Sequence, residues 1–194
     1  MKVKLLGLAV ATAFATGSAP ALAQSVVKIG HVAPLTGSIA HLGKDNELGG
    51  KLAIEELNAK KLKIGGKDVT FELMSEDDAA DPKQGTAAAQ KLVDAKVVGV
   101  VGHLNSSTSI PASRIYRDAG IPQISPSSTA PKYTQQGFKT TFRVVANDGQ
   151  LGGALGRYAV KEIKAQSIAI IDDRTAYGQG VADEFQKAAQ AAGG

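Results

Sequence analysis

Residues 97–109, with the sequence VVGVVGHLNSSTS, decide the fold of this chain. Four valines surround Gly99, and so short an apolar run is typical of a strand that is covered on both faces of a sheet. A glycine ends the run, a cluster of hydroxyl residues follows, and apolar residues then recur at helical spacing at Ala112, Ile115 and Ala119. This stretch therefore predicts a buried strand, a turn and a helix in succession.

The hydroxyl cluster at residues 106–109 marks the start of that helix. Ser106 or Ser107 is predicted to be the N-cap, because a serine hydroxyl accepts a hydrogen bond from the first N–H groups of a helix. The same N–H groups and the positive end of the helix dipole favour a bound anion such as a carboxylate. Two interpretations are open at this point: a simple helix cap, or an anion site built on the cap.

The composition indicates how the chain is stabilised and argues against nucleic acid as a partner. The chain has no cysteine among its 194 residues, so its stability must come from a packed core, which a domain of this length can build. Its formal net charge is only +4, and its lysines are scattered rather than gathered in a stripe. With aromatic residues at 5% as well, nucleic acid is not expected as a partner.

The first 23 residues have the pattern of a cleavable export signal. Lys2 and Lys4 form a basic start, residues 5–16 are apolar or small, and Ala21-Leu22-Ala23 matches the site that a signal peptidase reads. The apolar part is too short to span a membrane. The sequence therefore predicts export and cleavage after Ala23, and a mature chain that is not embedded in the membrane.

Strand-like and helix-like segments alternate along residues 24–145. Strands are predicted at residues 26–32, 69–74, 97–101 and 121–125, with a further one at 140–145. Helices are predicted at residues 43–61, 82–95 (capped by Asp81) and from the serine cluster to Ala119, where Gly120 stops the helix. This order predicts an α/β fold with a parallel sheet flanked by helices.

Ligands of such a sheet bind at the carboxyl ends of its strands. The loops expected at that edge comprise residues 35–38, 76–78, 102–109 and 125–129. Their polar side chains are mostly hydroxyls, which hydrogen-bond a small zwitterion without performing chemistry on it.

A second unit is predicted to begin near Asn147. Apolar residues mark a helical face at Leu151, Leu155, Tyr158 and Ala159. An apolar strand at residues 167–171 and a helix with Val181, Phe185, Ala188 and Ala192 on one face are expected to follow. Only one strand–helix step fits into this unit, so the strand is expected to lack parallel neighbours.

Four segments resemble the leucine/isoleucine/valine-binding periplasmic proteins of bacterial ABC transporters. They are DDAADPKQ (77–84), GHLNSSTSIPAS (102–113), SPSSTAP (125–131) and DDRTAYGQG (172–180), in this order. The resemblance implies the type I periplasmic binding protein fold, in which two α/β lobes close on a ligand without catalysis or cofactor. The family chain is nearly twice as long. The resemblance therefore implies a ligand-binding lobe at residues 24–145 and the start of a second, incomplete lobe at residues 146–194.

The resemblance also implies ligand-binding roles for five residues. Ser106 matches a serine that binds the ligand carboxylate through its hydroxyl and backbone N–H, and Thr129 matches a threonine that contacts both carboxylate and ammonium. Ser127 falls where the family uses a backbone carbonyl for the ammonium, and Tyr177 matches a tyrosine of the second lobe. Leu42 stands where the family has an aromatic residue, so the pocket for the ligand side chain is expected to differ.

These observations lead to one hypothesis and two alternatives. The hypothesis is a periplasmic protein that captures a small, branched-chain aliphatic amino acid and delivers it to an inner-membrane ABC permease, with no metal or cofactor. The first alternative is a ligand-sensing receptor domain of the same fold. The second is a hydrolase that uses Ser106 with His103 as its base.

The hydrolase alternative has little support in the sequence. No GxSxG motif surrounds Ser106, and no acid is evidently placed to orient His103, so we interpret His103 as structural. Asp77 and Asp78 could indicate a metal site, but one acidic pair without further ligands is a weak signal. We interpret that pair as a solvated or helix-capping turn.

Overall fold

The structure is a computed structural model that describes residues 25–194, so the predicted export signal and its cleavage site lie outside the described residues. These residues form a six-stranded sheet with the order β2-β3-β1-β4-β5-β6. The strands are β1 (Ser25–Ala33), β2 (Lys63–Ile64), β3 (Lys67–Asp77), β4 (Gly99–Gly102), β5 (Gln123–Ser125) and β6 (Thr141–Arg143). All neighbours pair in parallel except β2, which forms an antiparallel hairpin with β3. The predicted α/β class is confirmed, and the short hairpin strand is an addition.

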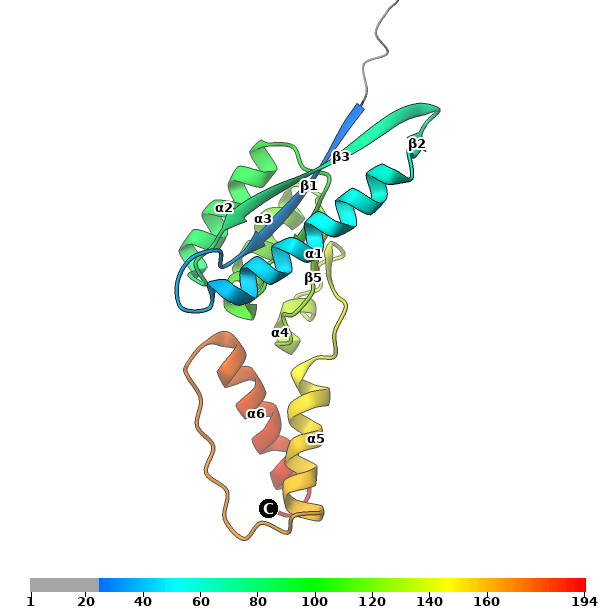
Figure 1. Ribbon diagram of the computed structural model, residues 1–194. Coiled ribbons are helices and arrows are strands. Elements are labelled where there is room, and N and C mark those ends of the chain that lie inside the picture. Colours follow the sequence, from blue (N-terminus) through cyan, green and yellow to red (C-terminus); the bar gives the residue numbers. More distant parts are fainter. Residues whose placement is uncertain (1–24) are drawn as a thin grey trace, which may run out of the picture.

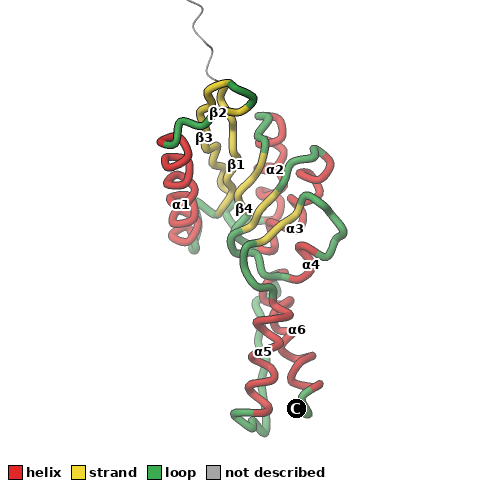
Figure 2. The backbone as a smooth tube through the Cα atoms, turned by 90° about the vertical axis from the view of Figure 1, so that its right-hand side faces the viewer, coloured by secondary structure: helices red, strands yellow, loops and turns green. Residues whose placement is uncertain are grey.

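Helices cover both faces of this sheet. They are α1 (Ala40–Ala59), α2 (Pro82–Asp94), α3 (Ser106–Asp118), α4 (Pro131–Thr134), α5 (Asp148–Lys161) and α6 (Ala176–Ala191). Helix α1 packs on one face, and α2 and α3 lie together on the other (Figures 1 and 2). The main core fills the space under α2 and α3, and its buried residues are Val32, Ala88, Ala89, Leu92, Val97, Val100, Ala112, Tyr116 and Ile121.

The predicted caps of α2 and α3 have different outcomes. Asp81 caps α2 as predicted, since its carboxylate accepts hydrogen bonds from the N–H groups of Lys83 and Gln84. The prediction that Ser106 or Ser107 is the N-cap of α3 is wrong, because Asn105 occupies that position and Ser106 is the first helical residue. The Ser106 hydroxyl instead accepts a hydrogen bond from a different loop, as described below.

The acidic segment at residues 76–78 is not a turn. Strand β3 continues to Asp77, and its pairing with β1 extends as far as Ala33 opposite Asp77. Hydrogen bonding to the neighbouring strand therefore overrides the turn propensity of this segment. Asp78 directly follows the strand and is completely buried, which corrects the interpretation of the pair as solvated.

Helices α5 and α6 form a pair that extends away from the sheet (Figure 1). They pack closely because α5 presents glycines to α6. A β-carbon at Gly152 would lie 2.8 Å from the carbonyl oxygen of Val181, and one at Gly156 would collide with the carbonyl oxygen of Phe185. A flat glycine face thus sets the short distance between the two helix backbones.

The apolar face predicted for α5 is not the buried one. Leu151, Leu155 and Tyr158 are exposed, whereas the buried residues of this helix include its glycines. The strand predicted at residues 167–171 is also absent, and Ile171 is 92% exposed. A strand requires a partner for its N–H and C=O groups, and no described residue forms a ladder with this segment.

Within residues 25–194, no helix combines the length and apolarity that crossing a membrane requires.

Candidate functional site

The carboxyl ends of the parallel strands meet at one edge of the sheet, where side-chain hydrogen bonds connect successive loops. Asp77, at the end of β3, accepts hydrogen bonds from the backbone N–H of Leu35 (2.8 Å) and the hydroxyl of Thr36 (2.5 Å). Burial raises the pKa of the Asp77 carboxyl, but these bonds and one from the N–H of Ala79 outweigh it and hold the pKa below its usual range. The Asp77 carboxylate therefore joins the loop after β1 to the end of β3 through hydrogen bonds.

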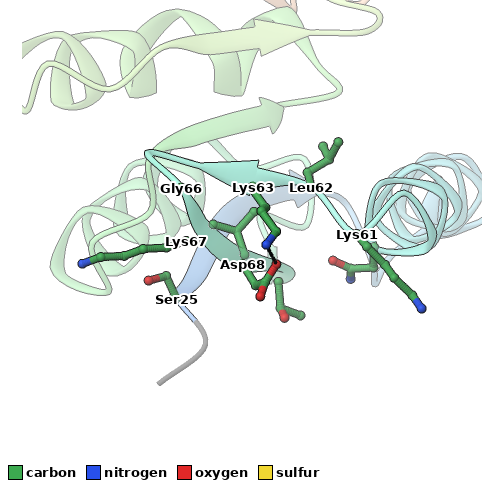
Figure 3. Close-up of a pocket in the computed structure, with 10 residues that line it drawn as sticks. Ser25, Lys61, Leu62, Lys63, Gly66, Lys67 and Asp68 are labelled. Carbon is green, nitrogen blue, oxygen red and sulfur yellow. Dashed lines mark ion pairs between the residues drawn. The ribbon is translucent and has the colours of Figure 1, made fainter. Parts of the chain in front are cut away.

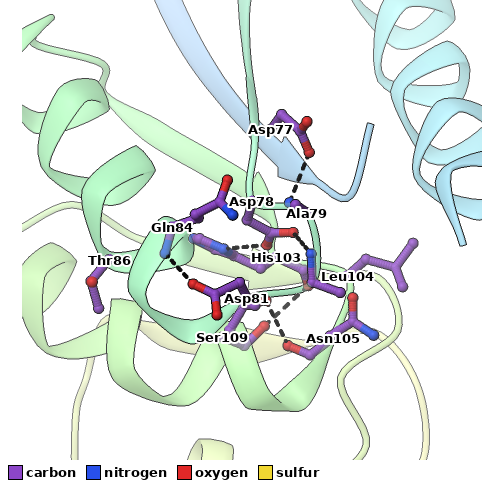
Figure 4. Close-up of polar contacts among 12 residues, drawn as sticks. Asp77, Asp78, Ala79, Asp81, Gln84, Thr86, His103, Leu104, Asn105 and Ser109 are labelled. Carbon is purple, nitrogen blue, oxygen red and sulfur yellow. Dashed lines mark hydrogen bonds and ion pairs between the residues drawn. The ribbon is translucent and has the colours of Figure 1, made fainter. Parts of the chain in front are cut away.

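Asp78 and His103 form a buried pair that joins β3 to β4. The Asp78 carboxylate lies 2.9 Å from Nδ1 of His103 (Figure 4). Nε2 of His103 lies 3.1 Å from the hydroxyl of Tyr116. All three residues are completely buried. An acid does orient His103, contrary to the sequence-based expectation, but both ring nitrogens are engaged away from Ser106. The arrangement supplies no general base to that serine.

The backbone of His103 connects β4 to the loop after β5. Its carbonyl oxygen accepts hydrogen bonds from the hydroxyls of Ser125 (2.7 Å) and Ser109 (3.1 Å). Ser128 donates to the same oxygen at 3.3 Å, and its hydroxyl lies 2.6 Å from that of Ser109. The buried hydroxyls of Ser109, Ser125 and Ser128 thus form hydrogen bonds with one another and with the backbone, as buried polar groups generally do.

Ser106 and Ser127 lie at this junction. The hydroxyl of Ser106, which is 2% exposed, accepts a hydrogen bond from the N–H of Ala130 at 3.2 Å. Ser127 donates to the carbonyl oxygen of Leu104 at 2.7 Å. A hydroxyl has one donor and two acceptor positions, so Ser106 keeps its O–H available for an acceptor such as a carboxylate. The structure brings these two predicted residues together, although neither caps α3.

Thr129 completes this cluster. Its hydroxyl is buried and makes no hydrogen bond of normal length within residues 25–194, although it lies near enough to the Asp148 carboxyl to influence its pKa. The carbonyl oxygen of Thr129 accepts from the N–H of Asp148 at 2.9 Å. The Asp148 side chain is completely buried beside it. Burial raises the pKa of the Asp148 carboxyl, Glu184 acts in the same direction, and the Thr129 hydroxyl and the Arg143 guanidinium oppose both. Like Ser106, Thr129 thus has a hydroxyl with unused hydrogen-bonding capacity, and it lies next to a carboxyl that burial favours in its neutral form.

Leu42 and Tyr177 do not join this hydrogen-bonded cluster. Leu42 lies in the first turn of α1 and is 48% exposed. Tyr177 lies in the first turn of α6, is 49% exposed, and lines a separate hollow of about 470 Å3 with Ile171 and Val181. The beginning of α6 nevertheless approaches the cluster, because a β-carbon at Gly180 would lie 3.7 Å from Asp148.

Arg143 is the residue of this site that sequence reasoning missed. Its guanidinium, at the end of β6, donates to the carbonyl oxygens of Ser128 and Ala130 and to the hydroxyl of Thr134. The only available signal was a cation within the strand predicted at residues 140–145, which indicates no particular contact. No group of three or more metal-ligating residues occurs among residues 25–194.

A second hollow, of about 1160 Å3, lies at the opposite end of the strands (Figure 3). The labelled Lys61 and Lys67 are turned away from each other in this view, and Lys63 pairs with Asp68 at 3.5 Å. Asn58, which also lines it, is engaged by the backbone of Phe71. No set of polar groups converges here, so the serine and threonine cluster is the better candidate for a ligand site.

The geometry of the cluster supports binding rather than reaction. Helix α3 begins at Ser106, and its first intrahelical hydrogen bonds are donated by Thr108 and Ser109 to the carbonyl oxygen of Asn105. The N–H groups of Ser106 and Ser107 precede those bonds and are therefore the ones a helix start offers to an anion. Together with the hydroxyls, they can hold a carboxylate without a nucleophile or base.

Comparisons with known proteins show similarity to proteins that bind small ligands. The sequence profile of the periplasmic binding protein family matches residues 26–194. The chain is 38% identical over 191 residues to the leucine-, isoleucine-, valine-, threonine- and alanine-binding protein of Pseudomonas aeruginosa, covering 98% of this chain and 50% of that relative. It is 41% identical over 186 residues to Leu/Ile/Val-binding protein homolog 1 of Brucella abortus, covering 96% of this chain and 48% of that relative. The chain thus spans about half the length of these relatives.

Solved structures agree on the fold. A leucine-binding protein from Thermotoga maritima superposes with a TM-score of 0.78 at 29% identity, over 87% of this chain and 47% of that one. A branched-chain amino acid transporter substrate-binding protein from Streptococcus pneumoniae, in complex with isoleucine, gives a TM-score of 0.74 at 28% identity, over 84% of this chain and 47% of that one.

Proposed function

Because the chain belongs to the periplasmic binding protein family, we propose that it captures a small branched-chain aliphatic amino acid for an ABC transporter. The observation that carries this proposal is the cluster at the carboxyl edge of the sheet. There the first N–H groups and the Ser106 hydroxyl belong to the start of α3, and the Thr129 hydroxyl belongs to the loop after β5, to which hydrogen bonds join that helix start. Such a set of donors suits a carboxylate.

In this proposal each residue has a distinct role. Ser106 donates its hydroxyl and backbone N–H to the ligand carboxylate, and Thr129 contacts both carboxylate and ammonium. The backbone carbonyl of Ser127 accepts from the ammonium. Leu42 and Tyr177 border the ligand from α1 and α6, and their half-exposed side chains leave room for such contacts.

The proposal extends to the whole protein and its location. Residues 24–145 would form a ligand-binding lobe, and residues 146–194 would begin a second lobe that closes over the ligand. Export through the signal at residues 1–23 would place the protein in the periplasm, where its closed form presents the ligand to an inner-membrane permease. No enzymatic activity is proposed, since both ring nitrogens of His103 are engaged by Asp78 and Tyr116.

The test is calorimetric titration of the full-length protein with each common amino acid. We expect heat of binding with L-leucine, L-isoleucine or L-valine, and none with their decarboxylated amines, which lack the group that the α3 N-terminus holds. Saturable binding of the amines, or no binding of any amino acid, would contradict the proposal.

A further inference from the structure

Arg143 makes an unusual set of contacts for a half-buried arginine. Nη1 donates to the carbonyl oxygen of Ser128 at 2.7 Å, and Nη2 donates to that of Ala130 at 2.8 Å. Nη2 also donates to the hydroxyl of Thr134 at 2.8 Å, and the guanidinium carbon lies 5.4 Å from the centre of the Tyr133 ring. Nη2 also approaches the carbonyl oxygen of Pro131 at 3.5 Å, so one side chain of β6 contacts five residues of the segment that follows β5.

Thr129 lies between the two carbonyls that Arg143 holds. Its own carbonyl oxygen accepts from the N–H of Asp148, so three consecutive carbonyls are bound by residues that come later in the chain. The N–H groups on either side are also engaged: that of Ser128 by the Ser125 hydroxyl (2.9 Å), and that of Ala130 by the Ser106 hydroxyl (3.2 Å). The buried Thr129 hydroxyl makes no hydrogen bond of normal length within residues 25–194; the Asp148 carboxyl is the polar group beside it.

The contacts require the shape of arginine and not merely its charge. A guanidinium is planar and presents several N–H groups in a fixed fork, so it spans two carbonyls that a single lysine ammonium cannot both reach in the same geometry. Burial lowers the pKa of Arg143, whereas Tyr133 and Asp148 act to raise it. The cation therefore has favourable neighbours despite its loss of solvent.

We propose that Arg143 is a positioning residue for amino-acid binding: it fixes the backbone of residues 128–130 so that the Thr129 hydroxyl can face the ligand. This inference rests on the proposed function. It assigns Arg143 no contact with the ligand. Its effect on affinity passes through Thr129, and this distinguishes it from an arginine that only stabilises the fold.

The experiment compares Arg143→Lys with Arg117→Lys in the full-length protein, using L-leucine as the calorimetric probe. Arg117 is a matched control, because it lies 4.3 Å from the centre of the Phe138 ring and bonds Asp118 but holds no carbonyl of this segment. We expect Arg143→Lys to bind L-leucine about tenfold more weakly, the size of one lost hydrogen bond to a charged group. Arg117→Lys should match the wild type.

A double-mutant cycle with Thr129→Ala then separates positioning from stability. If Arg143 acts through Thr129, Arg143→Lys should weaken binding by less than about twofold when Thr129 is already alanine. The same loss in both backgrounds would overturn the inference, as would wild-type affinity in Arg143→Lys. Hydrogen exchange of the free protein gives a readout without ligand: Arg143→Lys, but not Arg117→Lys, should speed exchange at Ser128 and Ala130.

Failure of the proposed function would look different. A wild-type protein that binds no amino acid would refute the function, and the inference with it, even where the exchange result is as expected. A wild type that binds L-leucine, combined with unchanged exchange and affinity in Arg143→Lys, would refute the inference alone.

Discussion

Ser106→Ala is the sharpest test of the carboxylate site, because the structure separates its two consequences. The hydroxyl accepts from the buried N–H of Ala130, so its removal leaves that donor without a partner. We expect this to cost roughly 1–3 kcal/mol of folding stability. The cost is present in both the free and the bound protein, so it cancels from the free energy of binding.

The loss of affinity then reports on the ligand contact alone. A hydrogen bond to a charged group contributes roughly 1.5–3 kcal/mol, so Ser106→Ala should weaken L-leucine binding about 10- to 150-fold in the full-length protein. Ser107→Ala is the matched control, since Ser107 is the next residue of the same helix. Its backbone N–H remains in place, so its affinity should stay close to that of the wild type.

Calorimetry and denaturant unfolding of the same preparations measure both effects. Reduced stability together with an unchanged dissociation constant in Ser106→Ala would refute the carboxylate assignment, because the serine would then serve only to tie two loops together. Equal loss of affinity in Ser106→Ala and Ser107→Ala would refute the side-chain role and leave only the helix terminus.

Three further changes test the packing around the site. Asp78→Ala leaves the buried Nδ1 of His103 without its partner, so urea unfolding should show a loss of stability of roughly 1–3 kcal/mol. A change below about 0.5 kcal/mol, the level of a surface substitution, would contradict the pairing. Gly156→Ala places a methyl group against the carbonyl oxygen of Phe185, so we expect the protein to lose about 1–3 kcal/mol of folding stability and α5 and α6 to be proteolysed faster. Unchanged proteolysis would disprove the contact. The raised pKa of Asp148 means that the native state keeps its proton to a higher pH than the unfolded chain, so this residue makes stability fall as pH rises from roughly pH 4. Asp148→Asn should flatten that fall in thermal unfolding, and an unaltered pH profile would count against the shift.

Most of the order of strands and helices in residues 25–145 could be predicted because its signals are local, whereas the short elements β2 and α4 were not predicted. The valine run around Gly99, the Asp81 cap and the stop at Gly120 each lie within a few residues of the structure that they specify. Since parallel strands end at one edge, their order also placed the four candidate loops there. The resemblance then pointed to Ser106, Ser127 and Thr129, which the structure brings together.

The errors concern features that depend on a partner distant in the sequence. Residues 167–171 are apolar enough for a strand, but a strand exists only where a neighbour supplies its hydrogen bonds. Leu151 and Leu155 have helical spacing, yet spacing does not say which side of α5 meets α6. The glycines decided that, because Gly156 allows an approach that a leucine face would prevent.

The polar network at the sheet edge shows why the candidate site was only half predictable. Side chains that a ligand would touch are hydroxyls in short motifs, so Ser106 and Thr129 stand out in the sequence. The groups that hold those motifs in place follow no period: Asp78 pairs with a histidine 25 residues away, and Arg143 reaches back 15 residues to Ser128. They bind backbone atoms or a buried ring, and any residue sequence can present a backbone carbonyl. Motif reading therefore suggests candidate contacts of such a site, whereas only the structure identifies the residues that set its geometry.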